Sequence, residues 1–155
     1  MSLTAACSEC HNEASPYEPI VAIVETDLSE ALLTSSATLQ HRAVGEMLFL
    51  EGEAPVGVYV LRSGEVDLLF ATRNGTVKPL RMATAGRILG LSAVVMGGSH
   101  DCSASTRLPC EVGFIARDEM LRLLDECPEV WPSVLRVLSS DVNEVYDDLR
   151  TMALG

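Results

Sequence analysis

The spacing of apolar and polar residues divides the chain into a helical segment, a central β-rich region and a second helical region. Apolar side chains recur at helical spacing over residues 20–33, which predicts a helix interrupted near Asp27. From Ser36 to Ile115, glycines 7 to 12 residues apart bracket short β-rich runs, a cadence typical of a β-sandwich or barrel. The pattern therefore predicts a mainly β fold with flanking helices.

Three features of the β-rich region allow sharper predictions. Alternation places Val66, Leu68 and Phe70 on one face of a strand. The Asn74-Gly75 pair that follows predicts a hairpin with a two-residue turn, because these residues tolerate positive φ. Pro79 has no backbone N–H, so we expect its strand at a sheet edge or at a bulge.

The period returns to that of a helix near the C-terminus. A short helix is predicted over 117–124 and a long one over 133–152, with prolines 128 and 132 between them. Apolar residues follow the long helix with steps of 4, 3, 4 and 3, namely Leu138, Val142, Val145, Leu149 and Met152. This heptad seam predicts a homodimer interface, and packing on the chain's own barrel is the alternative. We expect the other face, with Asp141, Glu144, Asp147 and Asp148, to be solvated.

Composition narrows the function classes. A length of 155 residues suits one domain, and the formal charge of −11 argues against nucleic-acid binding by this chain itself. The apolar runs are shorter than a membrane span, and the N-terminus lacks the basic and apolar segments of a secretory signal. We therefore expect a cytoplasmic protein that contacts no membrane.

Three segments in a fixed order carry a family resemblance. They read "GEMLFLEGEAPVGVYVLRSGEVDLLF", "GRILGLSAVV" and "CEVGFIARDEMLRLL", within about residues 43–149. The chain resembles the effector domain of the cAMP receptor protein (Crp/Fnr) family. The resemblance implies a double-stranded β-helix, or β-roll, of the cyclic nucleotide-binding type, followed by a dimerisation helix, with a small-molecule pocket inside the roll.

The resemblance also implies a division of the chain. We expect an irregular leader over 1–19, the effector domain over 20–132 and the dimerisation helix over 133–155. Relatives continue into a helix-turn-helix domain, and we expect none within these 155 residues. Contact with DNA would therefore need such a domain from elsewhere.

The phosphate-binding loop of that family corresponds to residues 86–105. Relatives that bind cyclic nucleotides carry a glutamate and an arginine where this chain has Leu91 and His100. Binding of cAMP is therefore not expected to be tight, and another small effector remains open. The predicted ligand-binding residues are Gly86, Gly90, Leu91, Ser92, His100, Asp101, Cys102 and Ser103. In the alternative, Leu91 fills the pocket and the chain is a structural or partner-binding dimer module.

The cysteines raise one further alternative. Five cysteines are an odd number, so we expect reduced thiols rather than a disulfide framework. Cys7, Cys10 and His11 match the spacing of haem attachment, and some relatives hold an iron–sulfur cluster through N-terminal cysteines, which leaves a redox or metal sensor open. A cluster needs four ligands, however, so no metal is predicted. The histidines lie in no catalytic signature, and we expect neither an enzyme nor a required cofactor.

Overall fold

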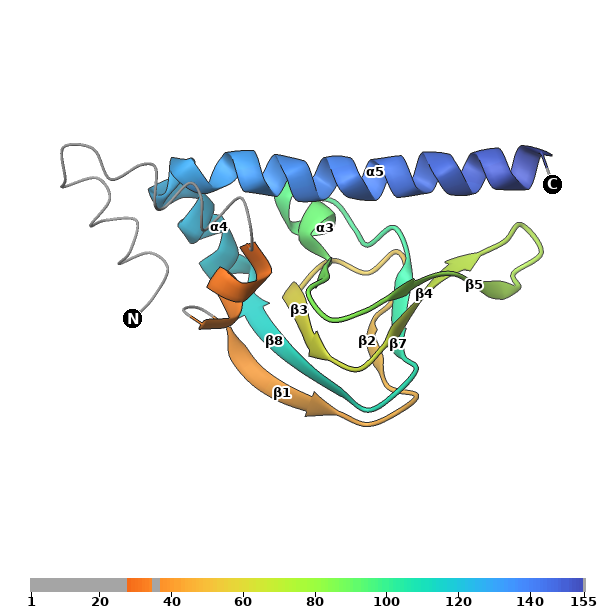
Figure 1. The fold of residues 1–155 in the computed structure, drawn as a ribbon, viewed down its shortest axis with the longest axis horizontal. Coiled ribbons are helices and arrows are strands. Elements are labelled where there is room, and N and C mark those ends of the chain that lie inside the picture. The colour runs from red at the N-terminus through yellow and green to blue at the C-terminus, as the bar shows by residue number, and fades with distance from the viewer. Residues whose placement is uncertain (1–27, 35–36, 155) are drawn as a thin grey trace.

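A computed structural model describes residues 28–34 and 37–154, which form two four-stranded antiparallel sheets covered by helices (Figure 1). The strands are β1 (Thr38–Arg42), β2 (Met47–Phe49), β3 (Gly57–Ser63), β4 (Val66–Ala71), β5 (Val77–Ala83), β6 (Ile88–Leu89), β7 (Ser103–Thr106) and β8 (Cys110–Ala116). The helices are α3 (Leu91–Met96), α4 (Arg117–Glu126), the short 3-10 helix η1 (Pro128–Val130) and α5 (Trp131–Leu154), after a helical segment at 28–34. The sheet orders β1-β8-β3-β6 and β2-β7-β4-β5 pair early strands with late ones, as the predicted β-roll requires.

Strand β3 is buried on both faces and separates two apolar cores. Val58 and Val60 point toward the helices, whereas Tyr59 and Leu61 point into the roll, because successive side chains of a strand face opposite sides. The helix-side core comprises Leu28, Ala31, Leu32, Val58, Val60, Ile88, Leu91, Val94, Ile115, Met120, Leu123, Leu124, Cys127, Val130 and Val134. The roll core comprises Leu48, Phe49, Tyr59, Leu61, Val66, Leu68, Ala83, Leu89, Ala104, Cys110 and Val112.

The hairpin predicted at Asn74-Gly75 forms between β4 and β5, but the two-residue turn is wrong. The Thr72 N–H donates to the Thr76 carbonyl at 2.8 Å and the Gly75 N–H to the Thr72 carbonyl at 2.9 Å. Gly75 has φ +78°, while no other residue type in the described part of the chain has positive φ. The loop therefore has three residues, 73–75. In this loop only Gly75 needs a positive φ, so Asn74 keeps the more favourable negative φ.

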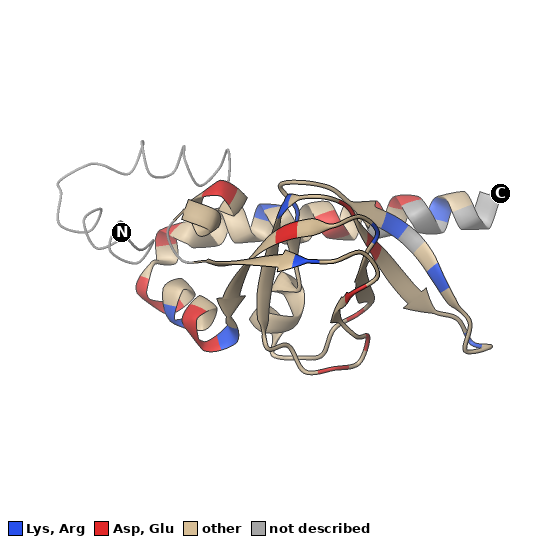
Figure 2. Cartoon of the chain, turned by 90° about the horizontal axis from the view of Figure 1, so that it is seen from below, with Lys and Arg blue, Asp and Glu red and all other residues tan. Residues whose placement is uncertain are grey.

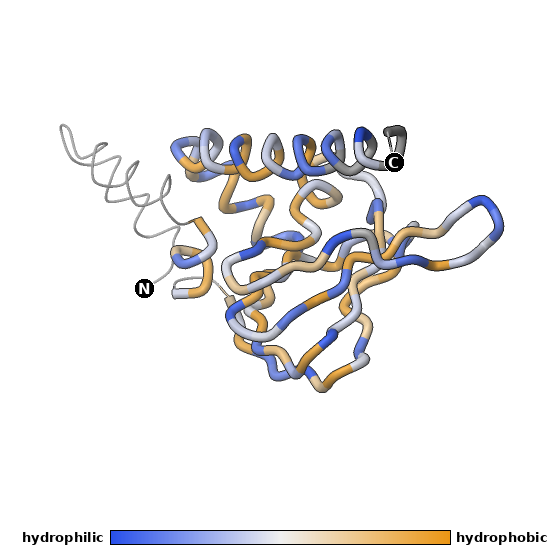
Figure 3. Tube along the Cα trace, turned by 45° about the vertical axis from the view of Figure 1, so that its right-hand side comes forward, coloured by the Kyte–Doolittle hydropathy of each residue, from blue (hydrophilic) through white to orange (hydrophobic). Residues whose placement is uncertain are grey.

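The predictions for the strands on either side of this turn are confirmed. Val66 and Leu68 are buried in the roll core, and Phe70 packs against them. Pro79 lies in β5, which pairs only with β4 at the edge of its sheet. The β4–β5 register also shifts between Leu68 and Leu69, so the proline occupies an irregular edge strand. Hydrophilic residues form the hairpin tip (Figure 3).

The predicted helices form with small changes at their ends. The segment 28–34 falls at the end of the helix predicted over 20–33, and residues 20–27 lie outside the described residues. Helix α4 extends to Glu126, and α5 begins at Trp131 with Pro132 in its first turn, where a missing N–H costs no helical hydrogen bond. Helix α5 crosses the whole roll (Figure 1). It packs on the helix-side core through Val134 and Leu138 and then passes over the roll.

The charged side chains are distributed over most elements. Acidic residues lie on α4, on α5 and on the loops, with basic residues interspersed among them in this view of the described residues (Figure 2). Within the described residues, no helix is both long and apolar enough to cross a bilayer.

Candidate functional site

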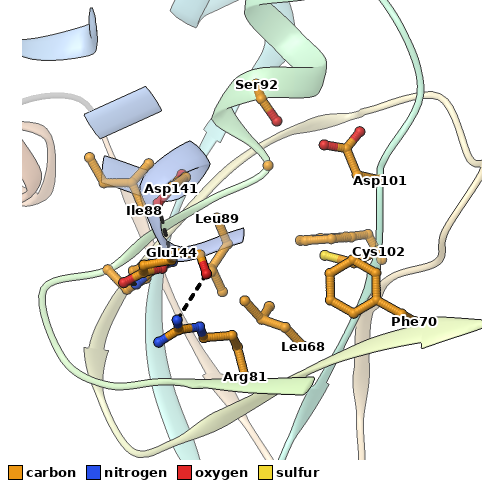
Figure 4. Close-up of a pocket in the computed structure, with 13 residues that line it drawn as sticks. Leu68, Phe70, Arg81, Ile88, Leu89, Ser92, Asp101, Cys102, Asp141 and Glu144 are labelled. Atoms are coloured by element: carbon orange, nitrogen blue, oxygen red, sulfur yellow. Dashed lines mark hydrogen bonds and ion pairs between the residues drawn. The ribbon is translucent and has the colours of Figure 1, made fainter. Parts of the chain in front are cut away.

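A cavity of about 270 Å³ lies where the roll meets α5 (Figure 4). Its apolar walls come from the roll core and from β6. The lining residues are Phe49, Leu68, Phe70, Arg81, Arg87, Ile88, Leu89, Gly90, Ser92, Asp101, Cys102, Asp141 and Glu144. Helix α5 supplies the last two, so the long helix forms part of the cavity wall.

Gly90 connects the cavity wall to α3, and its position favours glycine. Its φ is +83°, and an added Cβ would lie 3.1 Å from Cε1 of His100 and 3.4 Å from the carbonyl oxygen of Gly57. The left-handed backbone would strain any side chain, and the close approach would force the His100 ring to shift. This glycine therefore brings the start of α3 against the cavity.

Four of the predicted ligand-binding residues line the cavity: Gly90, Ser92, Asp101 and Cys102. Ser92 and Asp101 point toward one another on one side of the cavity (Figure 4). Leu91 and Ser92 are consecutive, yet they lie on opposite sides of the helix start. Leu91 is 1% exposed and belongs to the helix-side core, so it does not fill the cavity.

The other predicted residues do not line this cavity. His100 is 4% exposed, and its ring stacks on Phe49 with ring centroids 3.9 Å apart and an interplanar angle of 15°. The Gly86 N–H donates to the Leu61 carbonyl at 2.8 Å. The Ser103 hydroxyl accepts the Glu51 N–H at 2.8 Å. These residues hold the shape of the loop and of the neighbouring turn.

Burial lowers the pKa of His100 from its usual value of 6.5, against a smaller opposing effect of Glu53 and Asp101. The imidazole is therefore mostly neutral near pH 7. A neutral ring that faces Phe49 provides no cation for a phosphate.

Arg87 and two carboxylates of α5 form the polar side of the cavity, and the sequence did not predict this cluster. The Arg87 guanidinium donates to both carboxylate oxygens of Glu144, with Nη1 2.9 Å from Oε1. Its Nη2 lies 3.1 Å from Oδ1 of Asp141. Nη2 of Arg81 donates to the main-chain carbonyl of Glu144 at 3.0 Å (Figure 4). The prediction that Asp141 and Glu144 face solvent is therefore wrong.

The pKa directions follow from this geometry. The hydrogen bond to Glu144 raises the pKa of Arg87, and the same bond lowers the pKa of Glu144. Burial raises the pKa of Asp141, and Arg87 only partly offsets that effect. Glu144 is therefore the principal partner of the arginine. A two-pronged contact of this kind also fixes the orientation of the guanidinium.

The sequence contains only partial signals for this cluster of Arg87, Asp141 and Glu144. Arg87 stands inside the segment that carries the family resemblance, directly after Gly86. Asp141 and Glu144 are three residues apart, a spacing that places both on one side of a helix. Nothing in the local pattern shows that this side meets an arginine 57 residues earlier in the chain.

Cys102 is a free thiol on the cavity wall. Burial raises its pKa to about 11, and the carboxylate of Asp101 adds to the effect. The group is therefore a protonated thiol near neutral pH and a poor nucleophile, because the thiolate is the reactive form.

The structure tests only some of the remaining predictions about the cysteines. Cys127 is disulfide-bonded, so the expectation that all thiols are reduced is wrong for this residue. Cys7, Cys10 and His11 lie outside the described residues. Among residues 28–34 and 37–154, no three His, Cys, Asp or Glu side chains lie together as metal ligands would.

The predicted dimer seam is partly visible on α5. Leu138 packs against the helix-side core, whereas Val142 is 51% exposed. The side chains of Val145, Leu149 and Met152 are outside the described part of the structure. Leu135 and Tyr146 are further exposed apolar residues on this helix.

Comparison with known proteins places the fold in a family. The family model described as "Cyclic nucleotide-binding domain" matches residues 39–127. A solved cyclic nucleotide-binding domain from Methylobacillus flagellatus has a TM-score of 0.73 and 22% identity, covering 90% of this chain and 85% of that one. The Catabolite Activator Protein of Thermus thermophilus has a TM-score of 0.66 and 18% identity, covering 93% of this chain and 62% of that one.

Among curated proteins, Lysophospholipase NTE1 of Kluyveromyces lactis is 28% identical over 109 residues, which are 64% of this chain and 7% of the lysophospholipase. The chain thus spans a small part of that protein and less than two thirds of the Thermus protein. The β-roll with its loop at Gly90 and its long C-terminal helix agrees with the family match. The chain belongs to the cyclic nucleotide-binding domain family, and its resemblance to Crp/Fnr regulators is confirmed.

Proposed function

We propose that this chain is the ligand-sensing regulatory domain of a Crp/Fnr-type transcriptional regulator. The observation that carries the proposal is the cavity whose wall joins the loop at Gly90 to α5. A molecule bound there contacts the roll and the long helix at once. It can therefore favour one arrangement of α5 over another, provided that it binds the two arrangements with different affinity.

The role proposed is regulation without catalysis. The cavity thiol of Cys102 is protonated near neutral pH, and His100 does not line the cavity but stacks on Phe49. The family is one of regulatory domains. Within the proposal, the domain acts in the cytoplasm and affects DNA through a helix-turn-helix segment joined to it.

The residues of the cavity do not fit cAMP as other family members are expected to bind it. Leu91 stands where a ribose-binding glutamate is expected, and it belongs to the helix-side core. His100 stands where a phosphate-binding arginine is expected, and it is buried against Phe49. We therefore derive no regulatory step through a cyclic nucleotide.

A thermal-shift screen of the whole chain tests the proposal. The screen contains cyclic nucleotides, cyclic dinucleotides and small aromatic compounds. Compounds that bind in the cavity should raise Tm, and Cys102→Phe and Ser92→Phe, which fill the cavity from two elements, should abolish the rise. Val56→Phe, at an exposed position outside the cavity, is the matched control. Compounds that stabilise wild type and both filled variants equally, or a screen with no binder, would favour the pocket-closed partner-binding module.

Dimerisation through α5 is part of the proposal. Val142 is 51% exposed in the single chain, so its replacement should leave the fold of one protomer intact. Val142→Glu should shift the mass measured by analytical ultracentrifugation from dimer to monomer, because it places charges opposite one another in the seam. Asp147→Glu, which keeps the charge of an exposed site on the same helix, should stay dimeric. A dimeric Val142→Glu variant would place the interface elsewhere.

A further inference from the structure

The two arginines of the cavity are engaged by α5. Both nitrogens at the end of the Arg87 side chain face carboxylate oxygens of Glu144, and Nη2 also contacts Asp141 at 3.1 Å. Arg81 donates to the Glu144 carbonyl at 3.0 Å. A phosphate that approached Arg87 would have to displace Glu144 from a bidentate contact, which is the stronger form of an arginine–carboxylate pair.

The formal charge of the lining residues also opposes an anion. Arg81 and Arg87 contribute two positive charges, and Asp101, Asp141 and Glu144 contribute three negative ones. An anionic ligand would therefore add a like charge to a site that is already negative in sum, without a free cation to meet it. Like charges brought together in a partly desolvated site cost affinity.

The remaining lining favours an apolar or aromatic molecule. The apolar lining residues are Phe49, Leu68, Phe70, Ile88 and Leu89. The volume of about 270 Å³ exceeds the roughly 150 Å³ of an engineered apolar cavity that takes up benzene. A fused bicyclic ring is therefore of suitable size. Ser92 and Asp101 stand together on another side and can accept hydrogen bonds from it (Figure 4).

We infer that this cavity takes a small, mainly apolar or aromatic molecule without negative charge, and that it rejects cyclic phosphates because Glu144 and Asp141 occupy Arg87. The inference rests on the proposed ligand-sensing function and specifies the chemistry of its ligand. The carboxylates of α5 thus occupy the place beside Arg87 that a phosphate would otherwise take.

Three compounds with one ring system test the inference. Indole is uncharged, tryptamine is a cation and indole-3-acetate is an anion, and each is titrated against the whole wild-type chain by calorimetry and by NMR. Indole and tryptamine should bind, and indole-3-acetate should bind at least about tenfold more weakly than indole. Cys102→Phe should abolish binding of all three if they occupy this cavity.

Variants then separate charge from shape. In Asp141→Asn/Glu144→Gln, Arg87 is released, and the affinity for indole-3-acetate should rise at least about tenfold while that for indole stays nearly constant. The control Glu126→Gln/Asp147→Asn removes the same two charges from exposed positions outside the cavity and should leave the order of affinities unchanged. Asp101→Asn keeps both Arg87 contacts and should raise anion binding by a smaller factor, so a misfolded double variant does not end the test.

The outcomes distinguish the two proposals. Wild-type chain that binds indole-3-acetate as tightly as indole would overturn the inference about charge, while the ligand-sensing function would stand. A rise in anion affinity that is equal in the control variant would also overturn it. If none of the three compounds binds wild type or any variant, the inference about the ligand's chemistry is overturned, and the ligand-sensing function is then decided by the thermal-shift screen.

Discussion

The two sides of strand β3 differ in how completely they are packed. Toward the helices, Val58 and Val60 meet a continuous apolar core that includes Leu91. Toward the roll, Tyr59 and Leu61 belong to a core that ends at a cavity of about 270 Å³ with five charged side chains in its wall. The core beneath the helices suits stability, and the cavity in the roll suits a response to a ligand, because Asp141 and Glu144 of α5 line it and binding there can change the packing of this helix.

The start of α3 divides its residues between these two sides. Leu91 enters the helix-side core, and the next residue, Ser92, lines the cavity. A substitution at one position therefore tests stability and a substitution at its neighbour tests binding. The following predictions use this contrast, in order of decreasing effect.

The largest effect is expected from Leu91→Glu, which restores the residue type that binds ribose in relatives. Because Leu91 is 1% exposed in the helix-side core, the new carboxylate would be buried without a partner. We expect a loss of about 5 kcal/mol, enough to unfold a domain of ordinary stability. Circular dichroism and urea unfolding measure it. Leu91→Met, the matched control, should cost less than about 1.5 kcal/mol. A folded Leu91→Glu variant that binds cAMP would show that position 91 faces the cavity.

Leu-to-Ala substitutions compare packing on the two sides directly. Leu123→Ala in the helix-side core should cost about 3–4 kcal/mol, and Leu89→Ala on the cavity wall about 2–3 kcal/mol. The difference arises because the space left at Leu89 joins an existing cavity, whereas the space left at Leu123 is new. Urea unfolding at constant temperature measures both. Equal losses, or a larger loss at Leu89, would mean that the cavity side is as tightly packed as the helix side.

Arg87→Met removes the contact between the loop and α5 while keeping a long apolar stem. We expect a loss of about 1–2 kcal/mol, since the ion pairs are partly screened by solvent and two carboxylates lose their partner. Hydrogen exchange of α5 amides near Asp141 and Glu144 should accelerate. The control Arg62→Met breaks an ion pair with Glu111 in which the arginine is 57% exposed, and it should cost less than about 1 kcal/mol. Equal effects would mean that the Arg87 contact does not hold the helix.

The smallest effect concerns pH. Burial lowers the pKa of His100 below 6.5, so in mild acid the unfolded chain binds a proton that the folded chain resists. The free energy of unfolding should therefore fall as pH decreases from about 6.5 toward the folded-state pKa, and His100 should add no further loss below it. His100→Gln should remove this part of the slope in urea unfolding measured between pH 7 and pH 5. Val56→Gln, at an exposed position without a titratable side chain, is the control and should keep the wild-type slope. A slope unchanged in His100→Gln would assign it to other groups.

Much of the fold was predictable because its signals are local. The alternation of Val66, Leu68 and Phe70, the turn at Gly75 and the edge position of Pro79 each depend on residues close together in the sequence. The exact turn was missed because an Asn-Gly pair is compatible with two loop lengths, and the strand register decides between them. Gly90 was singled out through the family resemblance of its segment.

Features of the site that depend on local sequence were also predictable, whereas contacts between distant segments were not. The sequence pattern by itself determined a mainly β domain with flanking helices and a long C-terminal helix, since period and turn chemistry act over a few residues. The β-roll and the role of the loop around Gly90 were implied by the family resemblance. Tertiary structure alone decided that Leu91 enters the helix-side core while Ser92 lines the cavity, and that His100 stacks on Phe49. It also decided that Glu144 meets Arg87, 57 residues away. The packing of α5 over the roll sets these contacts, and a contact between distant segments leaves no periodic trace in either one.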